Sequence, residues 1–179
     1  MQTYVALLYS IILGEGRRVV MSDLKVMAES LGLKNPRTLA ATGNLVFDTD
    51  ETEIAALELL LETAFEATFG RHVDIIVRDA PGWRMLASAN PFPTESVATG
   101  DQVAVRVMRT PVPAESVSAL VACVGPDEKM QAVGGDIWVF LSRETPNSRL
   151  LAATSHKRLG IGTSRNWNTV RRLAEMVGA

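Results

Sequence analysis

Apolar residues in the first half of the chain follow two periods in turn, one typical of buried strands and one typical of helices. Continuous or alternating apolar runs predict strands, and apolar residues spaced three and four apart predict helices. The predicted elements are a strand over 4–13, a helix that opens at 22–23, hairpin strands over 37–41 and 45–47, a helix that follows 50–53, and a strand over 73–77. The order β-α-β-β-α-β is that of a ferredoxin-like fold, a split βαβ unit with an antiparallel sheet.

The second half repeats this order of elements without repeating the sequence. The predicted elements are a strand over 102–108, a helix from 113, hairpin strands over 130–133 and 137–141, and a final helix over about 166–177. We therefore expect an α+β protein with two ferredoxin-like halves in tandem. The expected domains are 1–79, an N-terminal ferredoxin-like subdomain; 80–101, a linker with a short helix; and 102–179, a C-terminal ferredoxin-like subdomain with a basic final helix.

Composition places the chain among globular proteins. Hydrophobic residues make up 47% of the 179 residues and charged residues 21%, which excludes a disordered chain. The apolar start is too short to span a membrane and lacks the preceding basic residues of a signal sequence. The single cysteine, Cys123, excludes an internal disulfide and suits a reducing compartment. We expect a cytoplasmic protein with no membrane partner, present as a monomer or a homodimer.

The charge is distributed unevenly, although the net charge is only -2. From Arg149 onward there are six basic residues and one acidic residue, Glu175, so a positive segment follows an acidic body. Such a segment attracts phosphate groups, including those of nucleic acids. The net acidity, and the lack of an exposed aromatic pair on the predicted strands, argue against a nucleic-acid partner.

The candidate site is the turn predicted just before the final helix. Glycines at 160 and 162 would let the backbone approach a ligand closely, and a helix N-terminus together with an arginine favours an anion. The candidate anion-binding residues are Lys157, Arg158, Thr163, Ser164, Arg165, Asn166 and Asn168. The same residue types also make an ordinary helix cap, in which a hydroxyl of Thr163 or Ser164 caps the helix and Trp167 fills the core. Helix caps are commoner than ligand sites, so this structural alternative stays open.

Other chemistry-bearing residues form no recognisable site. The two histidines, His72 and His156, lie in unrelated contexts, and with one cysteine they provide no metal-ligand cluster of standard spacing. Ser155 and His156 are sequence neighbours, and neighbouring side chains do not face each other in regular structure, so they make a poor catalytic pair. We therefore expect no metal and no cofactor, and the sequence identifies no catalytic residue.

Five segments along the chain together form a recognisable pattern. They are Tyr4–Leu8, Met21–Leu24, Thr42–Phe47, Asn90–Phe92 and Thr163–Val170. In this order they resemble a bacterial family catalogued as domain of unknown function 1697, whose pattern has a first strand leading into Arg-Gly-Ile-Asn-Val, a Ser-Gly-Asn hairpin and a closing Thr-x-Arg-Asn-Trp-x-Thr-Val. The resemblance implies a tandem ferredoxin-like fold and a cytoplasmic protein, but no activity. The chain departs from the pattern at 9–13, where the Arg and Asn are replaced, and at Thr42.

Four functions are compatible with these observations. The leading hypothesis is a binding module for a small anionic ligand, such as a nucleotide or a phosphometabolite, at the turn before the last helix. The alternatives are an enzyme that acts on a phosphorylated substrate at the same site, with Lys157 or His156 as the acid or base, a protein-interaction domain without a small ligand, and a weak nucleic-acid binder.

Overall fold

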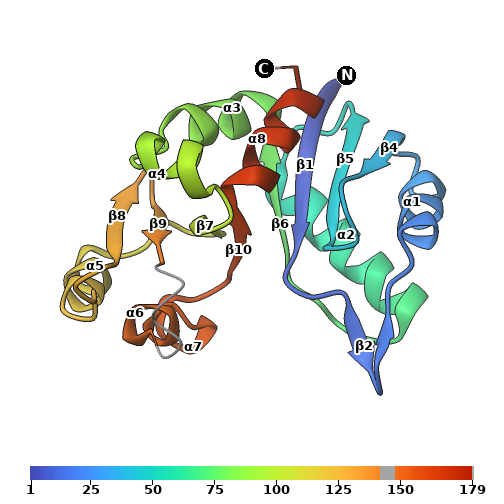
Figure 1. Ribbon diagram of the computed structural model, residues 1–179. Coiled ribbons are helices and arrows are strands. Elements are labelled where there is room, and N and C mark those ends of the chain that lie inside the picture. Colours follow the sequence, from blue (N-terminus) through green and yellow to red (C-terminus); the bar gives the residue numbers. More distant parts are fainter. Residues whose placement is uncertain (142–147, 179) are drawn as a thin grey trace. The chain divides into compact units, whose positions relative to one another are not determined.

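The computed structural model describes residues 1–141 and 148–178 of the chain (Figure 1). The chain folds into two compact units, Met1–Met85 with Arg172–Ala179, and Leu86–Arg171. The sequence predicts domains over 1–79, 80–101 and 102–179. A division of the chain into compact units does not test these ranges. These ranges therefore stay a prediction.

The first unit is built on a four-stranded antiparallel sheet. Its elements are β1 (Gln2–Leu8), β2 (Ile12–Gly14), β3 (Arg17–Arg18), α1 (Met21–Ser30), β4 (Lys34–Thr38), β5 (Asn44–Thr49), α2 (Ile54–Phe69), β6 (Ile75–Asp79) and the greater part of α3 (Ala80–Ser88). The strand order is β4-β5-β1-β6, and the short strands β2 and β3 pair separately. With the first sheet strand at the centre beside the third and the fourth, this is the ferredoxin-like arrangement.

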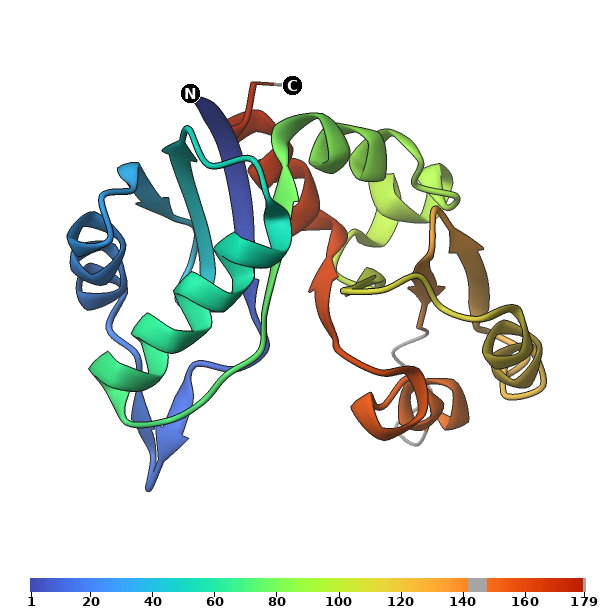
Figure 2. The same cartoon turned by 180° about the vertical axis from the view of Figure 1, so that it is seen from behind.

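One face of this sheet forms a core with both helices. Tyr4, Ala6 and Leu8 alternate along β1 and point to the same face, because successive strand residues point to opposite sides. The apolar stripe of α2 packs on this face through Leu57, Leu61 and similar residues, as its helical period predicts. Figures 1 and 2 show α1 and α2 on the same side of the sheet.

The second unit contains a second four-stranded antiparallel sheet. Its elements are α4 (Pro93–Thr99), β7 (Val103–Met108), α5 (Ala114–Val121), β8 (Lys129–Val133), β9 (Asp136–Phe140), α6 (Arg149–Ala153), α7 (His156–Leu159), β10 (Gly162–Asn166) and the first half of α8 (Trp167–Met176). The strand order is β10-β7-β9-β8, which is again ferredoxin-like. The predicted fold class, α+β with two ferredoxin-like sheets, is therefore confirmed.

Two local predictions are wrong. The first strand ends at Leu8, and the residues that follow lead into the β2–β3 hairpin. The predicted turn before the last helix is the strand β10, whose residues pair in antiparallel register with β7, from Gly162 with Met108 to Asn166 with Ala104.

Candidate functional site

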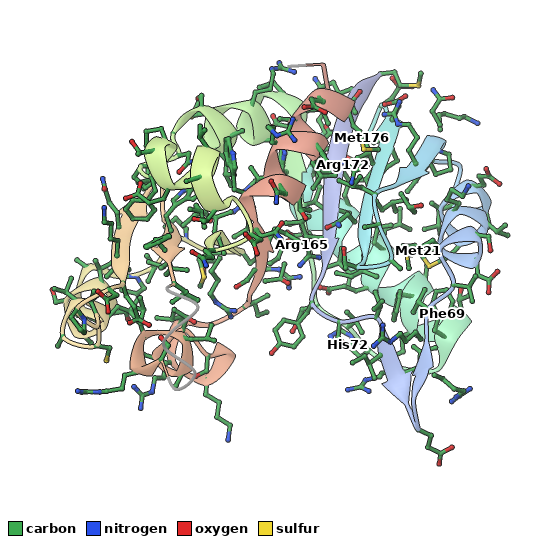
Figure 3. The ribbon with its side chains drawn as sticks, in the orientation of Figure 1. Met21, Phe69, His72, Arg165, Arg172 and Met176 are labelled. Atoms are coloured by element: carbon green, nitrogen blue, oxygen red, sulfur yellow. The ribbon has the colours of Figure 1, made fainter. Side chains whose placement is uncertain are left out.

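The strand β10 buries part of the predicted anion site. Thr163 and Arg165 are buried and Ser164 is exposed, in the alternation of a strand. The Arg165 Nη1 donates to the Thr163 Oγ1 and to the Ser164 carbonyl oxygen, both at 2.9 Å. Burial lowers the pKa of the Arg165 guanidinium to about 10, so it is still charged at neutral pH. The arginine that was expected to meet a ligand at a turn instead lies buried on β10 (Figure 3).

Of the two asparagines of the motif, Asn166 caps the start of α8. The Asn166 Oδ1 accepts the backbone N–H of Thr169 at 3.0 Å, which is the hydrogen bond of a helix N-cap. Asn168 is exposed, and its Oδ1 lies so close to Gly100 that a Cβ at that glycine would come within 2.8 Å. The helix cap that stood as the structural alternative is therefore present, but Asn166 makes it rather than a hydroxyl of Thr163 or Ser164.

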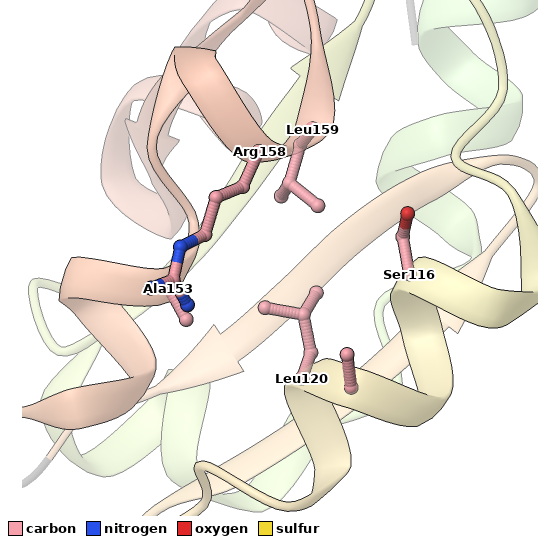
Figure 4. Close-up of a pocket in the computed structure, with 6 residues that line it drawn as sticks. Ser116, Leu120, Ala153, Arg158 and Leu159 are labelled. Atoms are coloured by element: carbon pink, nitrogen blue, oxygen red, sulfur yellow. The ribbon is translucent and has the colours of Figure 1, made fainter.

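The two remaining candidate cations lie on α7. Both Lys157 and Arg158 are exposed. Arg158 lines a cavity of about 250 Å³ between α5 and the pair α6 and α7 (Figure 4). The lining residues are Ser116, Ala119 and Leu120 of α5, Ala153 of α6, and Arg158 and Leu159 of α7. The structure thus separates the seven candidates. Thr163, Ser164 and Arg165 lie on the strand β10, Asn166 caps α8, Arg158 lines a cavity, and Lys157 and Asn168 are exposed.

The cavity is apolar except for two polar groups. Leu120 and Leu159 face each other across it, while the side chain of Arg158 extends from α7 toward α6 (Figure 4). Ser116 adds a hydroxyl, and among the described residues that line the cavity none is acidic. Binding sites commonly combine apolar walls with a few polar groups that orient the ligand. The arrangement therefore suits a small molecule with an apolar part and an anionic group.

Sequence reasoning found Arg158 but missed the α5 side of the cavity. Ser116 and Ala119 are small residues near the buried Leu120, and small residues on a helix face leave space beside a neighbouring element. These small residues are visible in the sequence, but they indicate a cavity only once the element that packs against this face of α5 is known.

Two further properties concern only the described residues. No group of three or more His, Cys, Asp or Glu side chains in this part of the chain is placed to hold a metal ion. None of the helices within 1–141 and 148–178 combines the length and the apolar character needed to cross a membrane.

Comparison with known proteins identifies the family. The sequence model of the family described as protein of unknown function (DUF1697) matches residues 1–138. The chain belongs to the DUF1697 family. The resemblance inferred from the sequence motifs is thereby confirmed, although the motif at 163–170 lies beyond the matched residues.

A solved structure supports the fold of this DUF1697 protein. The chain is similar to the conserved bacterial protein SP0830 from Streptococcus pneumoniae, with a TM-score of 0.76 and 21% sequence identity over 100% of this chain and 99% of that chain. At this identity the likeness shows the fold alone. No curated protein matches the chain in sequence.

In two of the motifs that pointed to DUF1697, an asparagine side chain stabilises a turn. The buried Asn44 of the hairpin donates its Nδ2 to the Leu39 carbonyl oxygen at 3.0 Å and to the Thr42 Oγ1 at 2.9 Å. In the Asn-Pro-Phe motif, the Asn90 Oδ1 accepts the Phe92 N–H at 2.9 Å. These asparagines satisfy backbone groups that turns leave open, so their place in the motifs has a structural explanation.

Proposed function

We propose that this protein binds a small organic anion in the cavity between α5, α6 and α7. The observation that carries the proposal is Arg158, a guanidinium at a cavity whose walls are otherwise mainly apolar. A guanidinium presents several donors in a plane and matches a carboxylate or a phosphate in two-point contact. The anionic ligand expected from the sequence is kept, but its site moves from the residues of β10 to α7.

The size of the cavity limits the ligand. A volume of about 250 Å³ is slightly below the range of roughly 300–1,000 Å³ of typical ligand pockets. A short-chain carboxylic acid or a small phosphate monoester fits this space, and a nucleotide would extend well outside it.

The walls favour a ligand with an apolar skeleton. Leu120 and Leu159 are buried, so a short alkyl chain that packs against them would be transferred from water to an apolar surface. Each methylene removed from water contributes about 0.8 kcal/mol. A fully polar anion such as inorganic phosphate would gain the contact with Arg158 but not this apolar term, and should bind more weakly.

Lys157 supplies attraction without direct contact. It neighbours Arg158 on α7 and is exposed, but it does not line the cavity. Arg149, at the start of α6 in the same unit, is also exposed and adds to the positive charge near this surface. We therefore assign recognition to Arg158 and general attraction to the surrounding charges.

A thermal-shift panel tests the proposal. The full chain is heated with carboxylates of increasing chain length, with small phosphate monoesters and with inorganic phosphate. A ligand at about 100 times its dissociation constant should add about 2.7 kcal/mol to the stability. The carboxylate and phosphate series distinguish the two anionic groups, and stabilisation should grow with chain length until the cavity is full.

Three variants separate the cavity from the general charge. Arg158→Gln should remove the stabilisation, whereas Lys157→Gln, which removes the same charge from the neighbouring residue of the same helix, should retain most of it. Ala119→Leu should fill the cavity and abolish binding while both cations stay in place. Equal losses in the two charge variants, or no stabilisation by any acid of the panel, would overturn the proposal.

A further inference from the structure

A second hollow lies in the first unit, where β1 ends. It has a volume of about 280 Å³ and is formed by the segment after β1, the strand β3 and the loop before β5. The lining residues are Tyr9, Ser10, Ile11, Ile12, Arg18, Ala41 and Thr42. The proposal below is independent of the anion cavity in the second unit.

The end of β1 and the segment after it are held against the loop before β5. The Leu8 N–H donates to the Gly43 carbonyl oxygen at 2.9 Å. Gly43 has a φ of +74°, and a Cβ there would lie 2.8 Å from the Cγ2 of Ile11 and 2.9 Å from the Cβ of Leu8. Only glycine fits such a contact with this backbone conformation. The relative position of the loops is therefore set before any ligand arrives.

Hydrogen bonds also stabilise the backbone and side chains that line the hollow. The Ile12 N–H donates to the Ser10 Oγ at 3.1 Å, and the Ile12 carbonyl oxygen accepts the Arg71 Nη1 at 2.9 Å. On the opposite side, the Thr42 Oγ1 accepts a hydrogen bond from the buried Asn44. These bonds fix the backbone and the hydroxyls that line the hollow, so a ligand would meet a preformed surface.

The chemistry of the lining combines a ring, an apolar wall and a cation. Tyr9 is 48% exposed and so is Ile12, which is unusual for an aromatic and a branched aliphatic side chain in one hollow. Arg18 adds a guanidinium from β3. Among the described residues that line the hollow none is acidic. A flat apolar group beside an anionic group is the ligand that these side chains recognise.

We propose that this hollow binds a mononucleotide, with the base stacked on Tyr9 and the phosphate paired with Arg18. Bases stack on exposed aromatic rings with little dependence on their identity. An arginine pairs with a phosphate by charge-assisted, two-point hydrogen bonds. The half-exposed Tyr9 and Ile12 leave the hollow open to solvent, so part of the nucleotide can extend beyond it.

Ligand-observed NMR tests this inference on the full chain, because it detects weak binding at an open site. The probes are AMP, its parent nucleoside adenosine, and inorganic phosphate. AMP should bind most tightly, and adenosine and phosphate should each bind roughly tenfold or more weakly, because each makes only one of the two contacts.

Variants on the same strand provide a matched control. Arg18→Gln should weaken AMP roughly tenfold and leave adenosine unchanged. Arg17→Gln removes the same charge from the adjacent residue of β3, which does not line the hollow, and should change AMP affinity less than twofold. Tyr9→Leu keeps an apolar side chain but removes the ring, and should weaken AMP and adenosine together, roughly five- to hundredfold, with phosphate unaffected.

Several results would overturn the inference. These are no binding of AMP, equal effects of Arg17→Gln and Arg18→Gln, or a single-stranded oligonucleotide that binds with steep salt dependence while AMP does not. Arg158→Gln should leave AMP affinity unchanged, because that residue does not line the hollow. This last control shows whether a failure concerns the nucleotide hollow or the proposed anion cavity.

Discussion

Two buried glutamates of α2 complete the hydrogen bonding of the edge strand β6. The Glu62 Oε1 accepts the Ile75 N–H at 2.9 Å, and the Glu58 Oε1 accepts the Val77 N–H at 3.0 Å. Two residues along a strand advance about 6.6 Å and four residues along a helix about 6 Å, so the two spacings match. The carboxylates of one helix face thus take the place of a further strand at the edge.

Replacing Glu62 by alanine should destabilise the protein by about 2 kcal/mol. A hydrogen bond to a charged group contributes about 1.5–3 kcal/mol, and the buried N–H of Ile75 would lose this acceptor. For a chain of this length, each kcal/mol shifts the melting temperature by about 2–4 °C, so a fall of about 4–8 °C is expected. Glu62→Gln keeps an oxygen that can accept the same N–H, and should cost about 1 kcal/mol.

Urea unfolding of the full chain, followed by circular dichroism, measures the effect. Glu66 lies one turn further along α2 with its side chain 59% exposed, so Glu66→Ala is the matched control and should change the stability by less than about 0.5 kcal/mol. Combining Glu58→Ala with Glu62→Ala should give nearly the sum of the single effects, because each carboxylate serves a different N–H. If Glu62→Ala costs no more than Glu66→Ala, or if the glutamine variant costs as much as the alanine variant, the edge-strand explanation is refuted.

Two further substitutions test the turn and the cap. Gly43→Ala should lower the free energy of unfolding by about 3 kcal/mol, because strain at positive φ adds to the close contact with Ile11. Gly16 has a φ of +78° and nothing within 4 Å, so Gly16→Ala should lower it by only about 1 kcal/mol. Equal urea midpoints for the two variants would contradict this. Asn166→Ala should lose about 1 kcal/mol through the lost cap, and Asn166→Ser, which keeps a capping oxygen, should recover most of it. An alanine variant as stable as the parent protein would show that the cap is dispensable.

The topology of each half could be predicted because its signals are local. In α2, Leu57, Leu61 and Phe65 recur at the helical period, and all three are buried in the core. The segment 103–108 alternates as a strand, and Pro113 stands directly before α5, as expected at a helix start. These patterns set the type and order of the elements, and the ferredoxin-like order then leaves few ways to arrange the strands.

The candidate site was harder to predict because its local composition is ambiguous. The segment from Gly162 to Asn166 is rich in glycine, hydroxyl and amide side chains, which are typical of a turn. Its backbone nevertheless pairs with β7 along its whole length, so the segment is a strand. Pairing between distant segments overrides weak local preferences, and the same pairing places Arg165 on a buried position.

The edge strand β6 is a second case in which tertiary structure decided what local sequence could not. In the sequence, Glu58 and Glu62 are charged residues on a helix and are expected to face water. In the structure both are buried, because β6 lies at the edge of the sheet and the two carboxylates accept hydrogen bonds from its N–H groups. A buried charge of this kind becomes favourable only through a partner that the helix itself does not contain.

Local sequence therefore decided most of the helices and strands of this DUF1697 protein, and the motifs revealed its family, because periodicity, caps and turn residues act over a few neighbouring positions. The strand β10 is an exception, since its pairing with β7 decided its structure. Tertiary structure alone decided where the candidate sites lie. The cavity beside Arg158 exists only because α5 and α7, far apart in sequence, pack into the same core, and the hollow beside Tyr9 only because Gly43 lets two distant loops touch. Contacts of this kind depend on the shape of both partners, and neither segment specifies them by itself.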